Sequence, residues 1–311
     1  MLGYIARRVL VAIPTILVII TVAFFMMRAA PGGPFDLERP MPEEVRQNVL
    51  AHFGFDRPLH EQYIDYLGDL AQGDLGPSLK FRDKTVSDII AEGFPVSATI
   101  GGLSILLALF LGSLLGSIAA LRQNKATDFA VMGFAMGGIT IPPFVMGPVL
   151  ALVFGLYLGL VPTGGLDPRY GMTAERLILP VITLALPQIA IISRLMRASM
   201  IEVLRSNYIR TAYAKGLSGP VVIFRHALRA AVLPLVSYLG PASAALVTGS
   251  IVIEQVFQLP GIGRQFVTAA LQRDYTVVMG VVILYATLII TLNLIADLLY
   301  ATLNPKVKIE S

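Results

Sequence analysis

A cationic segment, residues 194–230, interrupts the long apolar runs in the second half of this 311-residue chain. It carries seven Lys and Arg residues and a single acid, Glu202. Inserting seven cations into membrane hydrocarbon would cost on the order of 20 kcal/mol, at roughly 3 kcal/mol each. The segment must therefore lie at a membrane surface, where cations bind anionic lipid headgroups or a protein partner.

The residue pattern of this segment predicts a helix, a sharp turn and a second helix. Apolar or small residues recur at helical spacing from Met200 onwards. Gly216 is a helix stop, Ser218 an N-cap and Pro220 a first-turn residue of the next helix. The segment thus has the form of a short helical hairpin.

Two kinds of partner fit this hairpin. One is a layer of anionic lipid, on which an amphipathic helix rests. The other is a cleft on a cytoplasmic protein, into which the first helix projects. The face formed by Ala212, Ala214 and Gly216 has little apolar bulk to bury in lipid, which favours close docking to a protein.

Few other residues offer chemistry. The chain has no Cys, which excludes thiol, disulfide and iron–sulfur chemistry, and its three His residues lack metal-site spacing. None of its six Lys residues follows a Gly, so the Gly-Lys-Ser/Thr of a phosphate-binding P-loop is missing. We therefore expect no catalytic residue, metal or cofactor in this chain. If ATP drives its function, another chain binds the nucleotide.

Asp297 is the one acidic or basic residue inside the predicted membrane spans. An intramembrane acid is a candidate for transport, but a position this close to the end of the last span also suits a bond to a neighbouring helix. The lack of further acids argues against an ion-coupled secondary transporter, which needs relay or ion-ligand groups at mid-membrane.

The elements that must position the cationic segment are transmembrane helices. Hydrophobic residues make up 55% of the chain and charged residues 14%, with a mean hydropathy of +0.73, whereas soluble domains have roughly 25% charged residues. Six apolar runs approach or exceed the roughly 20 residues that cross a bilayer. They are Val9–Met27, Phe94–Leu121, Phe129–Val161, Leu177–Ile192, Ala231–Ile253 and Thr276–Leu299.

Charge predicts that both termini are cytoplasmic. The third run contains Ile141-Pro142-Pro143, where a helix must kink or break, and we count it as one kinked or re-entrant span. The alternate segments on the N-terminal side then hold 13 Lys and Arg residues but three acids, in agreement with the positive-inside rule. The first run exceeds the 7–15 apolar residues of a signal peptide, so we expect it to be a retained span.

The long segment before the second span, residues 28–93, predicts two short helices. Pro42 and Pro58 suit helix starts, and Gly54 and Gly73 suit helix ends. The segment is either a helical cap on the outer membrane face that contacts a soluble partner, or a plain spacer.

A second candidate site lies between the last two spans, where Glu254 is followed by Pro260-Gly261-x-Gly263 and the amphipathic stretch RQFVTAALQRDY. The Pro-Gly-x-Gly sequence is typical of a turn. It predicts a short external gate helix or, equally, an ordinary hairpin loop. Within the spans, Gly112-x-x-x-Gly116 and Gly133-x-x-x-Gly137 have the spacing that lets helices pack closely.

The cationic segment resembles the coupling loop, or EAA loop, of permease subunits in bacterial ABC importers. That loop has Glu-Ala-Ala, three residues and Gly; aligned on Gly216, this chain has Arg210-Thr211-Ala212, so a base replaces the acid. The departures resemble the peptide branch of the family. Further matching stretches, in order, are YIARRVLVAIPT, PLHEQYIDYL, GDLGPS, FPVSAT, SMIEVLRSNYIRTAYAKGL, IEQVFQLPGIG and RDYTVVMG.

The resemblance is closest to the B-type permease subunits of oligopeptide importers, with dipeptide, nickel and glutathione permeases as near alternatives. It implies an all-α integral membrane protein with six spans and the type I, MetI-like permease fold, in the bacterial inner membrane. Its parts would be the N-terminal tail and first span (1–27), an external helical loop (28–93), the core (94–300, with coupling loop 194–230) and a cytoplasmic tail (301–311).

The resemblance also implies partners: a homologous second permease, two cytoplasmic ATPase subunits that bind ATP and Mg, and an external peptide-binding protein. It implies no nucleic acid. The residues expected to couple the chain to an ATPase are Glu202, Arg205, Tyr208, Arg210, Thr211, Ala212, Tyr213, Ala214, Lys215 and Gly216.

Overall fold

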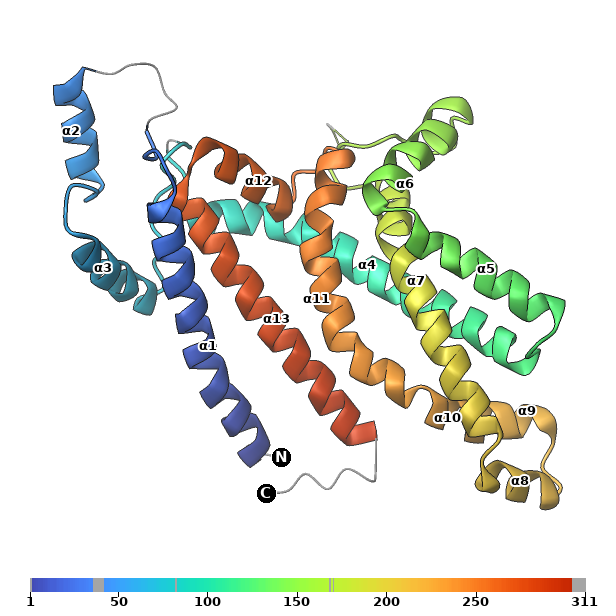
Figure 1. Cartoon of the computed structure of the whole chain (residues 1–311). Coiled ribbons are helices and arrows are strands. Elements are labelled where there is room, and N and C mark those ends of the chain that lie inside the picture. The colour runs from blue at the N-terminus through green and yellow to red at the C-terminus, as the bar shows by residue number, and fades with distance from the viewer. Residues whose placement is uncertain (1, 36–41, 82, 168, 170, 304–311) are drawn as a thin grey trace.

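The computed structural model describes residues 2–35, 42–81, 83–167, 169 and 171–303, and these residues form helices joined by turns (Figure 1). Four helices are long and apolar enough to cross a membrane. They are α1 (Leu2–Ala29), α4 (Val86–Leu121), α7 (Ala174–Leu204) and α13 (Tyr275–Leu303).

Two bent pairs of helices supply up to two further spans. In the first, α5 (Ala126–Thr140) meets α6 (Pro143–Leu150) and its π-helical continuation η1 (Ala151–Tyr157) at 103°. The break falls at Ile141-Pro142, which confirms the predicted interruption of the third apolar run. In the second, a bend of 46° separates α9 (Gly219–Val221), η2 (Val222–Ala227) and α10 (Leu228–Ala231) from α11 (Leu233–Val256).

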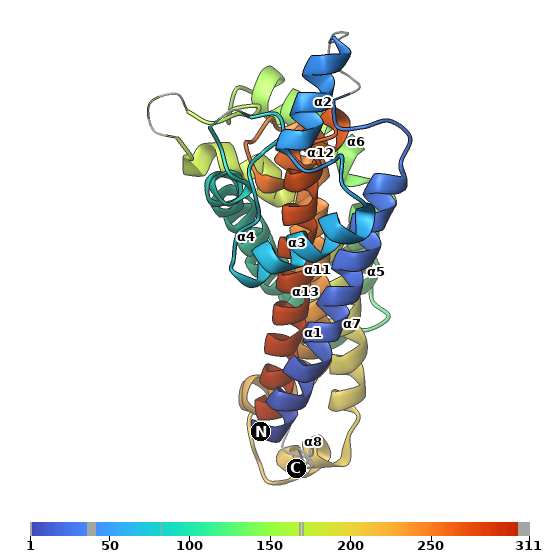
Figure 2. The ribbon, with the colours of Figure 1, turned by 90° about the vertical axis from the view of Figure 1, so that its left-hand side faces the viewer.

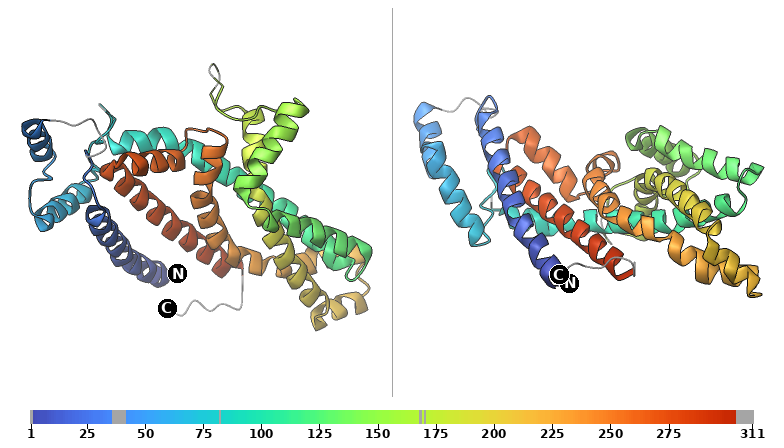
Figure 3. Two further views of the ribbon diagram at one scale, coloured as in Figure 1. Left: turned by 45° about the horizontal axis from the view of Figure 1, so that its top comes forward. Right: turned by 60° about the horizontal axis from the view of Figure 1, so that its bottom comes forward.

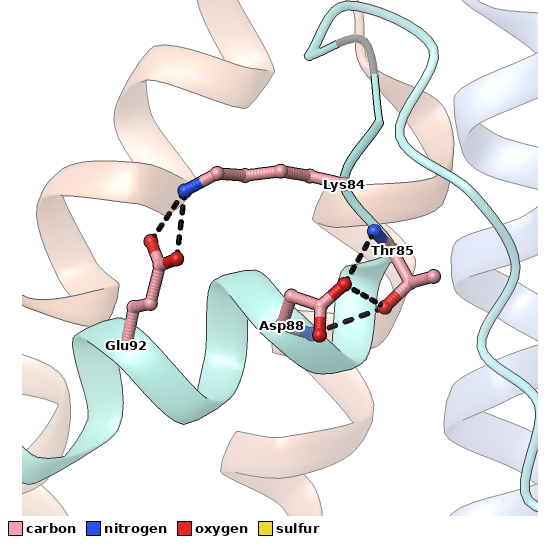
Figure 4. Close-up of polar contacts among 4 residues, drawn as sticks. All are labelled: Lys84, Thr85, Asp88 and Glu92. Atoms are coloured by element: carbon pink, nitrogen blue, oxygen red, sulfur yellow. Dashed lines mark hydrogen bonds and ion pairs between the residues drawn. The ribbon is translucent and has the colours of Figure 1, made fainter.

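The helices of the second and fourth apolar runs are longer than those runs. The α4 helix begins at Val86, eight residues before Phe94, because Thr85 and Asp88 form a capping box that satisfies the first-turn N–H groups (Figure 4). Lys84 also binds Glu92 across the first two turns, with an Nζ–Oε2 distance of 2.6 Å. The α7 helix continues twelve residues past Ile192, so the first third of the cationic segment is helical and belongs to α7.

The helices lie in a row. In both views of Figure 3, the two short helices that precede α4 lie at one edge with α1 next to them, α5 and α7 lie toward the other edge, and α13 and α11 lie between α1 and α7. The α4 helix crosses this row and packs on α7. At that crossing Gly112 faces Ile192, and a Cβ added to Gly116 would lie 2.4 Å from the carbonyl oxygen of Ser193. Close packing at the first Gly-x-x-x-Gly pair is thereby confirmed.

The segment before α4 contains the two predicted helices, α2 (Glu43–His52) and α3 (Leu59–Ala71), each preceded by the expected proline. Gly54 and Gly73 follow their ends with φ of +68° and +80°, as helix-terminating glycines do. The α3 helix packs its tyrosines on α1, where Tyr63 shares a hydrogen bond of 2.5 Å with the Thr21 hydroxyl.

The two ends of the molecule carry different elements. The first turn of α1, the last turn of α13 and the short helix α8 (Asn207–Ala214) lie at the lower end in Figures 1 and 2. The α2, α6 and α12 (Ile262–Gln272) helices lie at the upper end. The two candidate sites, the cationic segment with α8 and the segment from Glu254 to α12, thus lie at opposite ends of the bundle.

Candidate functional site

The predicted coupling helix is a separate short helix, α8. The sequence pattern predicts one helix from Met200 to Gly216, but this is wrong, because α7 ends at Leu204 and α8 starts at Asn207. Ser206 causes the break: its backbone is extended (ψ 153°) and its hydroxyl donates to the Val203 carbonyl oxygen at 2.6 Å. Such a local hydrogen bond competes with continuation of a helix.

Gly216 ends α8, as predicted, in a left-handed conformation with φ of +80°. Its N–H donates to the Tyr213 carbonyl, and the N–H of Leu217 donates to the Ala212 carbonyl, the two bonds of a Schellman motif. Ser218 stands at the N-cap of α9, but its side chain makes no capping bond, which corrects that part of the prediction. The turn therefore depends on Gly216.

One side of α8 is buried in the chain's own core. Ile209 and Ala212 pack with Met196 and Met200 of α7 and with apolar residues of η2. The expected Ala-Gly docking face is thereby divided, since Ala212 points inward whereas Ala214 and Gly216 are exposed. The α8 helix packs on η2, and η2 contacts α7, so a displacement of α8 reaches α7 by way of η2.

The other predicted coupling residues form an exposed surface, here termed the coupling surface. Among the described residues, neither Arg210 nor Lys215 makes an ion pair, so both cations are available to an acidic partner. Tyr208 and Tyr213 are each 47% exposed. The members of the coupling surface are Glu202, Arg205, Tyr208, Arg210, Thr211, Tyr213, Ala214, Lys215 and Gly216.

A buried ion pair, here termed the lower joint, fixes α7 to α5 near the coupling surface. Arg197 Nε and Nη2 each donate to the Asp128 carboxylate at 2.6 Å, and Asp128 is 1% exposed. The turn that precedes α5 is also bound to the base of α8, because Arg205 donates to the Gln123 side chain at 3.1 Å. Sequence reasoning missed this pair, since its members are 69 positions apart and leave no local pattern.

At the upper end, Glu254 is fully buried and connects three helices in what we term the upper joint. Ser97 of α4 donates its hydroxyl to Glu254 Oε1 at 2.6 Å, and the Arg264 N–H of α12 donates to Oε2 at 3.0 Å. The Ser250 side chain and the Gly263 N–H also donate hydrogen bonds to the Glu254 carboxyl group. A buried polar group left without its hydrogen-bond partners costs about 1–3 kcal/mol, so separation of these helices is unfavourable.

The glycines of the predicted turn make room for this carboxyl group. A Cβ on Gly261 would lie 2.3 Å from Glu254 Cδ, and one on Gly263 would lie 2.6 Å from Ile251 Cα. The turn consists of Pro260-Gly261 alone, since α12 begins at Ile262 and Gly263 is already helical, which corrects the predicted Pro-Gly-x-Gly turn. The structure thus brings Glu254, Pro260, Gly261 and Gly263 together and adds Ser97 to them.

Asp297 is bound to a neighbouring helix. Arg8 Nη2 of α1 lies 2.6 Å from Asp297 Oδ2, and both side chains are partly exposed at the lower end. This confirms the interpretation of Asp297 as a bond between helices near the end of the last span.

The sequence profile of the binding-protein-dependent transport system inner membrane component matches residues 112–309, and the profile of the N-terminal part of such components matches residues 1–101. The chain belongs to this family. In this transport component the upper joint connects the two matched regions, because Ser97 lies in the first and Glu254 in the second. The lower joint and the coupling surface lie wholly in the second.

Relatives of this transport component match it from end to end. The oligopeptide transport system permease protein OppB of Haemophilus influenzae is 50% identical, over 99% of this chain and 100% of the relative. OppB of Salmonella typhimurium is 51% identical with the same coverage. The dipeptide transport system permease protein DppB of Bacillus subtilis is 42% identical, over 100% of this chain and 99% of the relative.

Two solved structures share the fold of the transport component. One is the MetNI methionine ABC transporter in inward-facing conformations, with a TM-score of 0.55 and 14% identity over 70% of this chain and 96% of that chain. The other is an amino acid ABC transporter with histidines, with a TM-score of 0.51 and 15% identity over 70% and 94%. The all-helical fold expected for a MetI-like permease is thereby confirmed.

Proposed function

We propose that this chain is the membrane permease subunit of an ATP-driven oligopeptide importer in the bacterial inner membrane. The observation that carries the proposal is the identity of about 50% to OppB proteins along the whole chain. The exposed coupling surface, with two cations that no described residue pairs, supports it independently. The DppB proteins, which are 42% and 37% identical to this chain, make a dipeptide substrate the weaker alternative.

The chain has six spans, with both termini in the cytoplasm. Each bent helix pair then counts as one span, which brings the four long helices to six. The arrangement of Figure 1 supports this topology, because the first turn of α1, the last turn of α13 and α8 share the lower end. That end is cytoplasmic on this proposal, and the upper joint faces outward.

The coupling surface docks into a cleft of a cytoplasmic ATPase subunit. ATP and Mg are held by two such subunits, since this chain lacks the Gly-Lys-Ser/Thr of a P-loop. When the ATPase pair closes, it displaces α8, and the buried cluster that Ile209 and Ala212 share with η2 and α7 carries that displacement into the membrane. The lower joint passes it on to α5.

A homologous second permease forms the other half of the pathway, and a peptide-binding protein delivers the peptide from outside. The second Gly-x-x-x-Gly pair supports the heterodimer: added Cβ atoms on Gly133 and Gly137 would meet nothing within 4 Å in this chain. Both glycines border an apolar hollow of about 630 Å³ between α5, α6, η1 and α7. Small residues of this kind let a partner helix approach closely.

Reconstitution of the chain in liposomes with its second permease, the two ATPases and the binding protein tests the proposal. We expect peptide to stimulate ATP hydrolysis, and labelled oligopeptide to enter the liposomes when the membrane potential and proton gradient are collapsed. Uptake that followed the proton gradient, or that proceeded without ATP, would contradict the proposal and favour a secondary transporter.

A further inference from the structure

The α12 helix lies across the upper ends of α4, α11 and α13, where the predicted gate was expected (Figure 1). A gate helix needs a free end or a compliant joint, so that it can swing away from the helices below it.

The first turn of α12 is bound from below by two buried side chains. Ser97 accepts a hydrogen bond from the Ile262 N–H at 2.9 Å while it donates its own hydroxyl to Glu254. Glu254 in turn accepts from Arg264, the third residue of α12. Lifting this end would separate α12 from α4 and α11 together, and would leave a buried carboxyl group without its donors.

The backbones at this end are in direct contact. A Cβ on Gly93 of α4 would lie 3.0 Å from the Ile262 nitrogen and 3.1 Å from its Cα. Ile262 itself is fully buried, as is Leu259 just before it. No flexible side chain separates α12 from α4 that could absorb a rotation between them.

The last turn of α12 is fixed as well. The helix is followed by Arg273 at the C-cap, whose φ is +60°, and the next residue is the buried Asp274. Asp274 accepts the Ser78 hydroxyl at 2.5 Å and the Leu79 N–H at 3.2 Å, which binds this end to the segment that leads into α4. Neither end of α12 is therefore free.

We propose that Glu254 and Ser97 are positioning residues that clamp α12 to α4 and α11, so that these three helices move as one body during transport. On this inference α12 is a fixed brace and not a hinged lid, and the upper end opens by a displacement of the whole block. The inference rests on the proposed transport function. It concerns how the upper end opens, not how the coupling surface binds an ATPase.

A covalent clamp between α4 and α12 provides the test. The chain has no Cys, so G93C/I262C introduces one defined pair, at two positions that are in contact, since a Cβ on Gly93 would lie 3.1 Å from the Ile262 Cα. We expect the oxidised complex to keep the ATP-driven peptide uptake of the same complex after reduction, with disulfide formation measured by mass spectrometry. Loss of uptake on oxidation, restored by a reductant, would overturn the inference, because α12 would then have to leave α4.

The clamp also allows a rescue experiment. In E254Q, one of the two acceptor oxygens is replaced by an NH₂ group, which cannot accept from the donors of the upper joint. We therefore expect peptide uptake per ATP hydrolysed to fall about tenfold, while the ATPase subunits stay bound. Oxidation of E254Q/G93C/I262C should restore the uptake, an effect that a loss of folded protein would not allow. S97T, which keeps the hydroxyl, should resemble the wild type, and S97A should resemble E254Q.

Two outcomes would contradict the clamp: an E254Q complex with wild-type uptake per ATP, or a fully formed disulfide that restores nothing. If G93C lowers the membrane yield, S97C/I262C places a cysteine pair at the same contact. Because this variant lacks the Ser97 hydroxyl, it is scored as a rescue, with low uptake expected after reduction and restored uptake after oxidation. Failure of the transport proposal is distinguishable, because the wild-type complex would then show no ATP-driven uptake at all.

Discussion

The two buried carboxyl groups, Asp128 at the lower end and Glu254 at the upper end, are held in different ways. Asp128 faces a guanidinium, and the Arg197 side chain that carries it is 27% exposed. Glu254 is bound only by neutral donors among the described residues, two of them backbone N–H groups of α12. The lower joint thus joins two side chains, one of them a long arginine, and the upper joint joins side chains to a backbone.

This difference indicates where the molecule can deform. An arginine side chain can follow a moving carboxylate by changing rotamer, and its charge stays compensated meanwhile. A backbone N–H cannot follow without moving its helix. The lower end therefore has adaptable contacts beside the coupling surface, where an ATPase would push, whereas the upper end is fixed as a block.

Gly216→Arg should have the largest effect, and it should act on the lower end alone. A side chain at a φ of +80° costs about 1–2 kcal/mol, and the guanidinium would project from the coupling surface. We expect the variant to insert into the membrane but to lose its co-purification with the ATPase subunits. Disulfide formation between G93C and I262C should be unchanged, since the upper joint is far away.

Gly219→Ala is the matched control for that variant. Gly219 is three residues away, has no positive φ, and an added Cβ would meet nothing within 4 Å. It should keep wild-type ATPase binding. Equal ATPase binding by the G216R and wild-type proteins would contradict the coupling role of this turn.

Asp128→Asn should have the next largest effect, through the lower joint. Removing one partner of a buried ion pair lowers the free energy of unfolding by about 3–5 kcal/mol. Because Arg197 is partly exposed, we expect a smaller loss of stability, about 2–3 kcal/mol. A lower thermal denaturation midpoint of the purified complex would show the loss. The D128N/R197Q double variant should recover part of it, because the unpaired cation is then gone.

Arg122→Gln serves as the control for the lower joint, since Arg122 lies in the same turn, but among the described residues its side chain makes only an exposed hydrogen bond of 3.3 Å to the Thr127 hydroxyl. Its midpoint should match that of the wild type. If D128N and R122Q had the same denaturation midpoint, the ion pair would not fix α5 to α7. The proposed difference between the lower and upper joints would then be wrong for the lower joint.

Much of the fold could be predicted from the sequence, because it depends on local signals. The positions of α2 and α3 were predicted from prolines and glycines, and the break in the third apolar run was predicted from Ile141-Pro142-Pro143. Helix ends were less accurate where a short-range hydrogen bond decided them. The Thr85–Asp88 capping box extended α4, and the Ser206 hydroxyl separated α8 from α7.

The site was predicted in part for the same reason. Gly216 and the exposed cations of α8 are readable because they are neighbours in sequence. The contacts of Ser97 with Glu254 and of Asp128 with Arg197 span 157 and 69 residues, and no periodicity links such positions. The direction of Ala212 was also hidden, since it depends on how α8 lies on η2.

Arg8→Gln should have the smallest effect, and it tests whether exposure separates Asp297 from the two buried acids. The Arg8 and Asp297 side chains are 50% and 38% exposed, and exposed ion pairs contribute about 0–1 kcal/mol. We expect R8Q and D297N to shift the denaturation midpoint slightly and equally, and to leave ATP-driven uptake unchanged. Because water and salt screen this pair, the shift should shrink further at high ionic strength. Loss of uptake in D297N with normal uptake in R8Q would instead give Asp297 a role of its own in transport, since the same bond is missing from both variants.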